Sequence, residues 1–215
     1  MTLCGSQRIG SFNQIVHDYA VSSIQDSGAI VNPINLGELN LPLYNPNEEV
    51  LTFPENATYL KQQLVECDGI FIASPEYNGF TSPLLLNAIT WASRGEGDMY
   101  AGFKGKIVSL MSTSPGPMGG LRMLRSMNTM FADMGSVIVP GYNTIGNAFQ
   151  VFDVKESSIT DDKTKQKIDT ACSNLVHYCR YEANREHDCE IYRELHKSQT
   201  MGEYGQVDLP TAATS

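Results

Sequence analysis

The segment from Gly5 to Asn13 contains the first residues whose types and spacing suggest chemistry. It joins a short apolar stretch to a predicted helix, and the first backbone N–H groups of a helix have no acceptor within that helix. These amides and the positive end of the helix dipole favour an anion, to which hydroxyl, amide and guanidinium groups add donors. Those side chains are Ser6, Arg8, Ser11 and Asn13. The segment therefore predicts a phosphate site.

The same segment lacks two features of other nucleotide loops. It does not contain G-x-G-x-x-G, and its G-x-x-x-x-G-S has no lysine for the outer phosphates of a triphosphate. A terminal monophosphate fits better. The structural alternative is a capped helix beside a surface arginine, because Ser and Gly are common at helix starts. The residues leave this alternative open.

A second candidate loop, S-P-E-Y-N-G, follows an apolar run and precedes an unusually apolar helix. Pro75 and Gly79 fix a bend, while backbone amides and the Asn78 side chain can bind the edge of a flat heterocycle, with Tyr77 near its ring. Glu76 could hold the loop by accepting backbone hydrogen bonds, or it could merely cap the following helix. Both roles remain open.

The third loop, from Ser112 to Gly120, combines three glycines with alternating prolines. The glycines let backbone amides approach a planar ligand closely, and the prolines restrict the backbone. An ordinary turn seldom needs so many special residues, so the composition favours a functional loop.

The elements around these loops alternate between strand-like and helix-like periodicity, which is typical of an α/β domain. Strands are predicted at 3–4, 29–36, 69–74, 106–111 and 136–140, and helices at 12–27, 56–67, 83–93, 119–134 and 161–186. Right-handed crossovers favour a flavodoxin-like, doubly wound five-stranded parallel sheet of order 2-1-3-4-5. Ligands of such sheets bind beyond the carboxyl ends of the strands, where the three loops would meet.

Composition narrows the function classes. Lys and Arg number 15 against 24 Asp and Glu, and the net charge of −9 argues against nucleic acid as a partner. The longest apolar runs are too short to span a membrane. Five cysteines without a C-x-x-C pair and four histidines without ligand spacing give no support for a metal site. The chain begins without a signal-like segment, so we expect a cytoplasmic protein.

Four motifs read together resemble the NADPH-dependent FMN reductase family, whose relatives include azobenzene, quinone and chromate reductases. They are G-S-Q-R-x-x-S-x-N, S-P-E-Y-N-G, L-x-N-A-I-x-W and S-P-G-P-M-G-G-L-R. The resemblance covers approximately residues 1–180. It implies a flavodoxin-like fold that holds FMN noncovalently.

The resemblance also implies roles for individual residues. The FMN phosphate would be bound by Ser6, Arg8, Ser11 and Asn13, with the backbone amides of Gln7 and Phe12. The ribityl chain and the isoalloxazine ring would lie along Pro75, Glu76, Tyr77, Asn78 and Gly79. The third loop would border the ring from the other side through Ser114, Gly116 and Gly119.

The expected reaction is ping-pong hydride transfer, in which NADPH or NADH reduces the bound FMN, leaves, and is replaced by a small-molecule electron acceptor. Quinones, azo dyes, free flavin and metal oxyanions are the expected acceptors. The three loops contain neither His nor Cys, so no catalytic side chain is predicted.

Two other functions are considered. A flavin-binding electron carrier usually has a hydroxyl-rich phosphate loop without arginine, so Arg8 speaks against that alternative. A small nucleotide phosphotransferase is disfavoured by the missing lysine.

The helix that contains Leu84, Leu85, Leu86, Ile89 and Trp91 is more apolar than a contact with one sheet requires. It either forms a subunit interface or is deeply buried within one chain. The resemblance implies a homodimer or homotetramer. We expect an FMN-binding domain over 1–180 and a polar C-terminal extension over 181–215.

Overall fold

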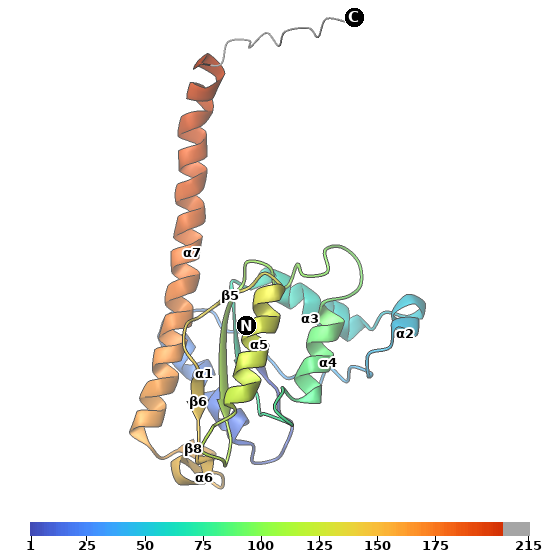
Figure 1. Cartoon of the computed structure of the whole chain (residues 1–215), viewed down its shortest axis with the longest axis vertical. Coiled ribbons are helices and arrows are strands. Elements are labelled where there is room, and N and C mark those ends of the chain that lie inside the picture. Colours follow the sequence, from blue (N-terminus) through green and yellow to red (C-terminus); the bar gives the residue numbers. More distant parts are fainter. Residues whose placement is uncertain (204–215) are drawn as a thin grey trace, which may run out of the picture. The chain divides into compact units, whose positions relative to one another are not determined.

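The computed structural model (Figure 1) describes the backbone of residues 1–203, and the side chains except at 186–188 and 191–203. Contacts divide the chain into two compact units, Met1–Cys179 and Arg180–Ser215. The end of the predicted C-terminal extension, 204–215, lies outside the described residues. The first unit contains the sheet and the three loops.

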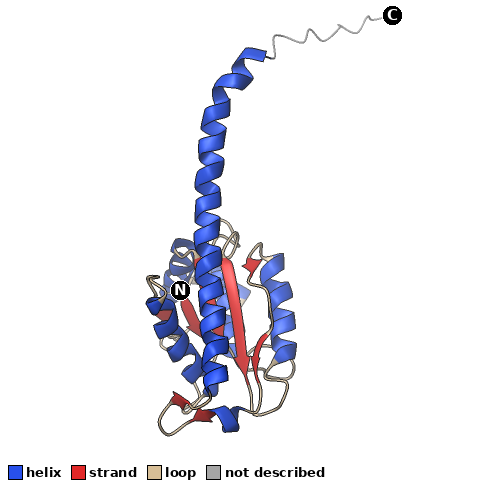
Figure 2. Ribbon diagram, turned by 90° about the vertical axis from the view of Figure 1, so that its left-hand side faces the viewer, coloured by secondary structure: helices blue, strands red, loops and turns tan. Residues whose placement is uncertain are grey.

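Parallel strands form the centre of the first unit, in the order β2-β1-β3-β4-β5. Their bounds are β1 Thr2–Cys4, β2 Pro33–Ile34, β3 Gly69–Ala73, β4 Ile107–Thr113 and β5 Val137–Ile138. Figure 2 shows the sheet between helices. The predicted α/β class and strand order are confirmed.

The edges of the sheet differ from the prediction. At one edge β2 has two residues rather than the expected 29–36, and it begins at Pro33, which has no N–H to donate to a ladder. At the other edge β5 pairs with the start of β4, while a sixth strand, β6 Asn143–Ile145, pairs with its end. The predicted strand 136–140 therefore stops early, at a bend that contains Pro140 and Gly141, whose φ is 110°.

Helices cover both faces of the sheet, and the side chains of β3 show why. Ile70 and Ile72 join one core cluster, while Phe71 and Ala73 join the other, as expected for a strand buried on both faces. The helices α3 Glu55–Glu66, α4 Pro83–Ala92 and α5 Leu121–Asp133 contribute to the first cluster. The second cluster contains residues of α1 Phe12–Asp26 and of the early part of α7 Asp162–Glu203.

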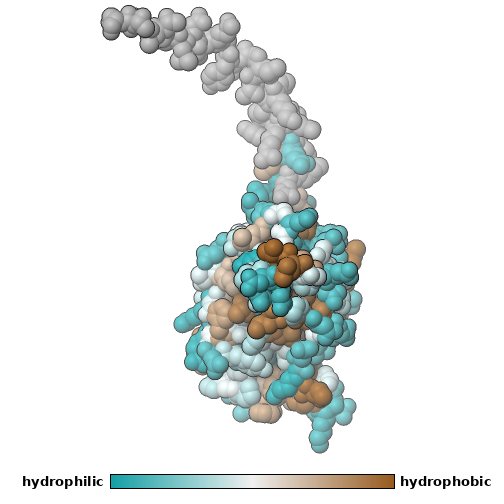
Figure 3. All heavy atoms as spheres, turned by 90° about the vertical axis from the view of Figure 1, so that its right-hand side faces the viewer, coloured by the Kyte–Doolittle hydropathy of each residue, from teal (hydrophilic) through white to brown (hydrophobic). Residues whose placement is uncertain are grey.

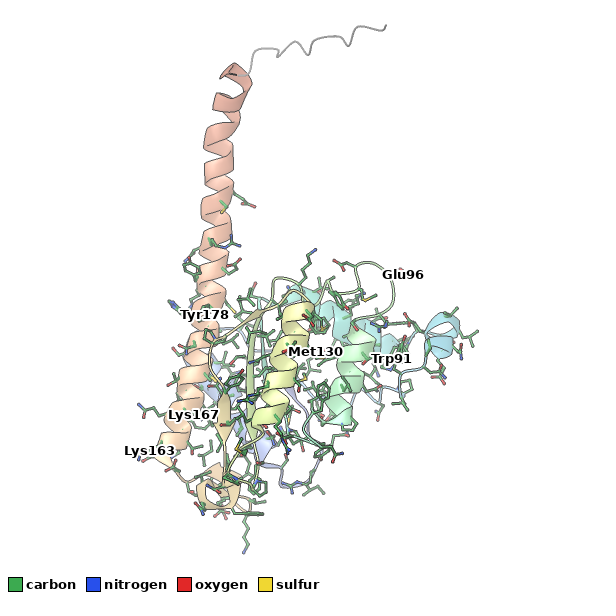
Figure 4. All side chains as sticks on the ribbon, viewed as in Figure 1. Trp91, Glu96, Met130, Lys163, Lys167 and Tyr178 are labelled. Atoms are coloured by element: carbon green, nitrogen blue, oxygen red, sulfur yellow. The ribbon has the colours of Figure 1, made fainter. Side chains whose placement is uncertain are left out.

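Several short elements are absent from the predictions. The segment between the predicted strand 29–36 and the predicted helix 56–67 includes α2 Pro46–Leu51. The segment after β6 contains α6 Ala148–Val151 and the hairpin of β7 Phe152–Asp153 with β8 Ser158–Ile159. The segment around α2 is anchored on α4 through Trp91 (Figure 4), whose indole N–H donates to the Pro42 carbonyl at 2.7 Å. Tyr44 and Phe53 pack edge-on against the same ring. Within the described residues, none of the helices has the length and apolarity that a membrane span requires.

Candidate functional site

The three loops follow the carboxyl ends of three neighbouring strands of the sheet. In the register of β1, β3 and β4, Cys4 pairs with Ala73, and Ala73 pairs with Met111, so the strands end side by side. The Gly5 amide donates to the Ala73 carbonyl at 2.9 Å, and the Ser74 amide donates to the Met111 carbonyl at 3.1 Å. The loops predicted from the sequence therefore begin next to one another.

The first loop presents unused hydrogen-bond donors at the start of α1. Ser11 is the N-cap residue in extended backbone, but its hydroxyl makes no capping bond. The backbone amides of Gly10, Phe12 and Asn13 donate to no acceptor among the described residues. Gly10 has a φ of 68°, and a Cβ there would lie 2.6 Å from Val154 Cγ1, so the turn requires glycine. The first loop thus has the donor set that an anion needs.

A cavity of about 520 Å³ opens beside these donors. Its lining residues come from the first loop, from α1, from the segment after β2 and from the turn between β7 and β8, and they include Ser6, Gln7, Arg8, Ser11, Asn35, Glu38, Asn40 and Ser157. Neither the second nor the third loop lines it. The structure therefore brings the predicted phosphate contacts Ser6, Gln7, Arg8 and Ser11 together in one cavity, without the residues expected near the ring.

Arg8 is exposed at the mouth of this cavity. Its guanidinium donates to the Gly10 carbonyl at 3.4 Å and lies 5.6 Å from the centre of the Phe12 ring. Phe12 is buried and packs edge-on against Phe149 at 5.1 Å. The arginine is therefore positioned over the loop, no described residue forms a salt bridge with it, and its charge is available to a ligand.

Asn13 occupies a different place from the one expected for a phosphate ligand. Its side-chain amide donates to the Thr113 carbonyl at 3.0 Å, and its side-chain oxygen accepts from the Thr113 amide at 3.1 Å. The side chain is buried, with 4% of its residue surface exposed. Both the NH2 group and the oxygen of the Asn13 side chain are thus bound within the protein, and the side chain joins α1 to the end of β4. Of the Asn13 donors, only the backbone N–H has no acceptor among the described residues.

Glu76 connects the second loop to the helix after the third. Its carboxylate accepts from the backbone amides of Arg122 at 3.1 Å and Met123 at 3.3 Å, and from Arg122 Nε at 2.7 Å. The helix that follows the second loop is capped instead by Ser82. Of the two open roles, Glu76 holds its loop by accepting backbone hydrogen bonds, and the helix it caps is α5, whose N-cap, Gly120, has no side chain.

The remaining residues of the second loop form a tight turn. Tyr77 and Phe80 exchange backbone hydrogen bonds of 2.8 and 2.9 Å, and Asn78 and Gly79 between them have φ values of 55° and 84°. Two consecutive residues with positive φ are typical of a type I′ turn. The turn leaves 49% of the Tyr77 surface exposed, so its ring is accessible to a ligand.

The third loop is held by the segment that begins with β6. The Ser114 amide donates to the Ile145 carbonyl at 3.1 Å, the Asn147 amide to the Gly116 carbonyl at 3.2 Å and the Ala148 amide to the Ser114 carbonyl at 3.1 Å. Gly119 has a φ of 57°, and a Cβ there would lie 2.7 Å from the backbone carbon of Ile145. Sequence reasoning missed this support, although N-T-I-G-N after the fifth strand carries the polar and glycine signals of a turn.

Unused polar groups also lie beneath the third loop. Within the described part of the chain, the buried hydroxyls of Ser112 and Thr113 have no hydrogen-bond partner, and the same holds for Ser109, earlier in β4. A buried hydroxyl without a partner costs on the order of 1–3 kcal/mol. Two of the three hydroxyls, those of Ser112 and Thr113, lie at the carboxyl end of β4. This end of the sheet therefore has hydrogen-bonding groups without a partner among the described residues.

The thiols near the sheet are unsuited to nucleophilic chemistry. Burial raises the pKa of Cys4, which ends β1, to about 11 and that of Cys172 to about 12. Both thiols therefore remain protonated near neutral pH. No cluster of His, Cys, Asp and Glu suited to a metal ion occurs among the described residues.

Comparison with known proteins places this geometry in a family. The family model for NADPH-dependent FMN reductase matches residues 1–150. An NAD(P)H-dependent FMN reductase of Pseudomonas aeruginosa is 30% identical, with 77% of this chain and 86% of that protein covered. An NADPH:quinone oxidoreductase of Arabidopsis thaliana is 33% identical, with 77% and 84% covered.

Two further proteins are also similar to this chain. A 2-hydroxy-1,4-benzoquinone reductase of a Burkholderia species is 39% identical over 54% of this chain, and the match covers 60% of that protein. The structure of FerB, a flavoenzyme NAD(P)H:acceptor oxidoreductase of Paracoccus denitrificans, aligns with a TM-score of 0.71 at 24% identity, covering 84% of this chain and 96% of that one. This chain belongs to the NADPH-dependent FMN reductase family.

Proposed function

We propose that the protein binds FMN across the three loops and uses NADPH or NADH to reduce a quinone in two successive half-reactions. The observation that carries the proposal is the first loop, where Arg8, Gly10 and Ser11 line one cavity. The Ser11 hydroxyl makes no capping bond there, and the amides of Gly10, Phe12 and Asn13 at the same helix start have no acceptor among the described residues. A phosphomonoester needs this combination of donors and positive charge. When bound, FMN supplies the hydride chemistry, and the protein supplies position and electrostatics.

At the phosphate end, Ser6, Arg8 and Ser11 would bind the phosphate with the backbone amides of Gln7 and Phe12. The Asn13 backbone amide would join them, while its side chain fixes the distance between α1 and β4. A phosphate here would lie at the N-terminus of α1, where the helix dipole favours negative charge.

At the ring end, the second loop would line the ribityl chain and one side of the ring through Pro75, Glu76, Tyr77, Asn78 and Gly79. Ser114, Gly116 and Gly119 would border the other side. The contacts of Glu76 with the start of α5 support this arrangement, because they join the two loops into one frame. The half-exposed Tyr77 and Met118 give this end an apolar rim.

We propose a quinone as the acceptor because an apolar rim favours a flat, largely apolar molecule over a metal oxyanion. The names of the relatives above agree with this choice. Azo dyes, free flavin and metal oxyanions are the competing acceptors. Since one ring face would serve donor and acceptor in turn, the kinetics would be ping-pong.

The test is a titration of the protein with FMN, followed by turnover. We expect a flavin spectrum, oxidation of NADPH or NADH that depends on a quinone, and parallel double-reciprocal lines. Arg8→Ala should weaken FMN binding about tenfold, because it removes a charge-assisted contact. Lys104→Ala, an exposed lysine beyond the other end of the strands, is the matched control. Failure to bind FMN would refute the proposal, and FMN binding without direct reduction by NADPH would favour an electron carrier.

We also propose a homodimer or homotetramer. The exposed apolar residues Leu43, Val50 and Leu51 lie in the segment around α2, with exposed fractions of 84%, 86% and 81%. Figure 1 shows α2 on the right-hand side of the molecule, and Figure 3 views the molecule from that side. Apolar side chains gathered on one face are a common feature of subunit contacts. Light scattering of the purified protein tests this assembly.

A cytoplasmic location is the final part of the proposal. All five cysteines are free, which suits a reducing compartment. Fractionation of cells that express the protein tests the location.

A further inference from the structure

Two arginines on α5 are unexplained by the cofactor contacts proposed above. Arg122 and Arg125 are three residues apart, so they lie on the same side of the helix, and both are exposed. They follow directly after the third loop in a chain whose net charge is −9. Exposed arginines on an acidic protein attract anionic ligands. This pair of arginines is therefore a candidate binding site for an anion.

Arg122 is held beside the second loop. Its Nε and one terminal nitrogen contact the same Glu76 oxygen, at 2.7 and 2.5 Å, yet 71% of its side chain remains exposed. A Cβ on Gly79 would lie 3.9 Å from Arg122 Nε, so the guanidinium lies next to the turn that carries Tyr77. The N–H groups that do not face Glu76 remain open to solvent. The ion pair therefore fixes the direction of the guanidinium without using all of its donors.

Arg125 has a different environment. Its guanidinium carbon lies 5.9 Å from the centre of the Tyr142 ring, and 50% of the Tyr142 surface is exposed. Among the described residues, no acceptor binds the Arg125 guanidinium. An arginine held near an aromatic ring by a cation–π contact, with no acceptor on its N–H groups, can still bind a bidentate acceptor such as a phosphate.

These arginines cannot serve the phosphate that Arg8 would bind. Arg8 precedes α1, whose apolar residues pack in one core cluster, whereas α5 contributes Met123 and Leu124 to the cluster on the opposite face of the sheet. A ligand whose phosphate lies at α1 and whose ring reaches the second and third loops would have its far end near Arg122. The cations of α5 therefore lie where a second, anionic molecule would approach that ring.

We infer that Arg122 binds the pyrophosphate of the nicotinamide cosubstrate and that Arg125, against Tyr142, binds the 2′-phosphate that distinguishes NADPH from NADH. This inference rests on the proposed function and names residues that set the choice of cosubstrate. The pyrophosphate is common to both nucleotides, so Arg122 would affect both. The 2′-phosphate occurs in one, so Arg125 would affect NADPH alone.

The test measures binding of NADP⁺ and NAD⁺ to the FMN-loaded protein by isothermal titration calorimetry. Arg125→Ala should weaken NADP⁺ binding about tenfold and change NAD⁺ binding by less than twofold, because one charge-assisted contact is lost. Arg122→Lys should weaken both nucleotides by a similar factor, since lysine keeps the charge but not the planar fork. Lys104→Ala, which removes an exposed charge away from the loops, should change neither.

The inference is overturned if Arg125→Ala leaves NADP⁺ binding unchanged or weakens both nucleotides equally. Arg125→Lys adds a second check, because partial retention of NADP⁺ affinity is expected from charge alone. Failure of the proposed function would look different, since the unaltered protein would then bind no FMN or would not be reduced by either nucleotide. Hydrogen exchange of residues 121–133 in each variant verifies that α5 is intact.

Discussion

Asn13 and Thr113 form a reciprocal pair, in which the side-chain amide of one residue makes both hydrogen bonds that the backbone of the other can offer. The two bonds measure 3.0 and 3.1 Å and join positions 100 residues apart in the sequence. They connect the first turn of α1 to the last residue of β4, so the first loop is fixed relative to the third. An asparagine suits this task because its amide carries a donor and an acceptor side by side.

Asn13→Ala should lower the free energy of unfolding by about 2–4 kcal/mol, because it leaves the amide and carbonyl of Thr113 buried without partners. FMN binding should weaken as well, since the amides of the first loop lose their fixed position. Urea unfolding and FMN titration measure the two effects. Asn128→Ala, on α5, is the control, with an expected change below about 0.5 kcal/mol. A loss of FMN affinity with unchanged stability would indicate direct contact with the ligand instead.

Glu76→Ala should loosen the start of α5, because two backbone amides and the Arg122 guanidinium lose their acceptor. The loss of a cap costs about 0.5–2 kcal/mol. Glu76→Gln should be milder, since its amide oxygen still accepts from the backbone while the ion pair disappears. Hydrogen exchange in residues 121–125 is the measurement. Equal protection in all three proteins would show that the carboxylate does not hold this helix.

The sequence predicted the strand order and the adjacent starts of the three loops because both follow from local periodicity and from the general geometry of parallel sheets. The unbroken apolar run of β3 indicates burial on two faces, and the structure places Ile70 and Phe71 in opposite core clusters. Such signals are contained in a few neighbouring residues. They can therefore be interpreted without knowing the rest of the fold.

The roles of Asn13 and Glu76 depended on contacts that no local pattern contains. The partner of Asn13 lies 100 residues away, and the helix that Glu76 caps begins 45 residues later rather than directly after its own loop. The local sequence suggested a phosphate as the partner of Asn13. For Glu76 it left two roles open, and it could identify neither the backbone amides that the carboxylate accepts from nor the helix to which they belong. Similarly, β6 and the hairpin of β7 and β8 are two or three residues long, too short for a periodic signal.

Stability should fall at alkaline pH because of the buried thiols. Burial raises the pKa of Cys172 from its ordinary value of 9.0 to about 12 and that of Cys4 to about 11. Above pH 9 the unfolded chain loses these protons while the folded chain keeps them, so unfolding becomes more favourable as pH rises. The stabilisation is complete below about pH 8 and is lost between about pH 9 and 12.

Cys172→Ala isolates this effect. The variant should be less stable at pH 7 through its lost packing, yet its free energy of unfolding should decline less steeply between pH 9 and 11. Ala171→Gly, which shortens the neighbouring buried side chain without removing a titratable group, is the control and should keep the original slope. Urea unfolding at each pH gives the slopes. Identical slopes for Cys172→Ala and the unaltered chain would contradict the assignment.

Two separate effects disfavour a side chain at Gly10, so substitutions there test how the shape of the first loop affects FMN binding. Its φ of 68° is unfavourable for any other residue, and a Cβ would lie 2.6 Å from Val154 Cγ1. Gly97 shares the first effect, with a φ of 83°, but a Cβ there would meet nothing within 4 Å. Gly97→Ala should therefore cost only the backbone strain, about 1–2 kcal/mol. Gly10→Ala should cost more and should weaken FMN binding, since relief of the clash moves the loop.

The double variant Gly10→Ala with Val154→Ala separates the two effects. Val154 lies in the turn between β7 and β8, and 38% of its surface is exposed, so its truncation alone should cost little. If the clash moves the loop, the double variant should regain most of the FMN affinity that Gly10→Ala loses, while the backbone strain remains. A double variant that binds FMN as weakly as Gly10→Ala would place the whole effect in the backbone, and the hairpin would then have no part in shaping the phosphate site.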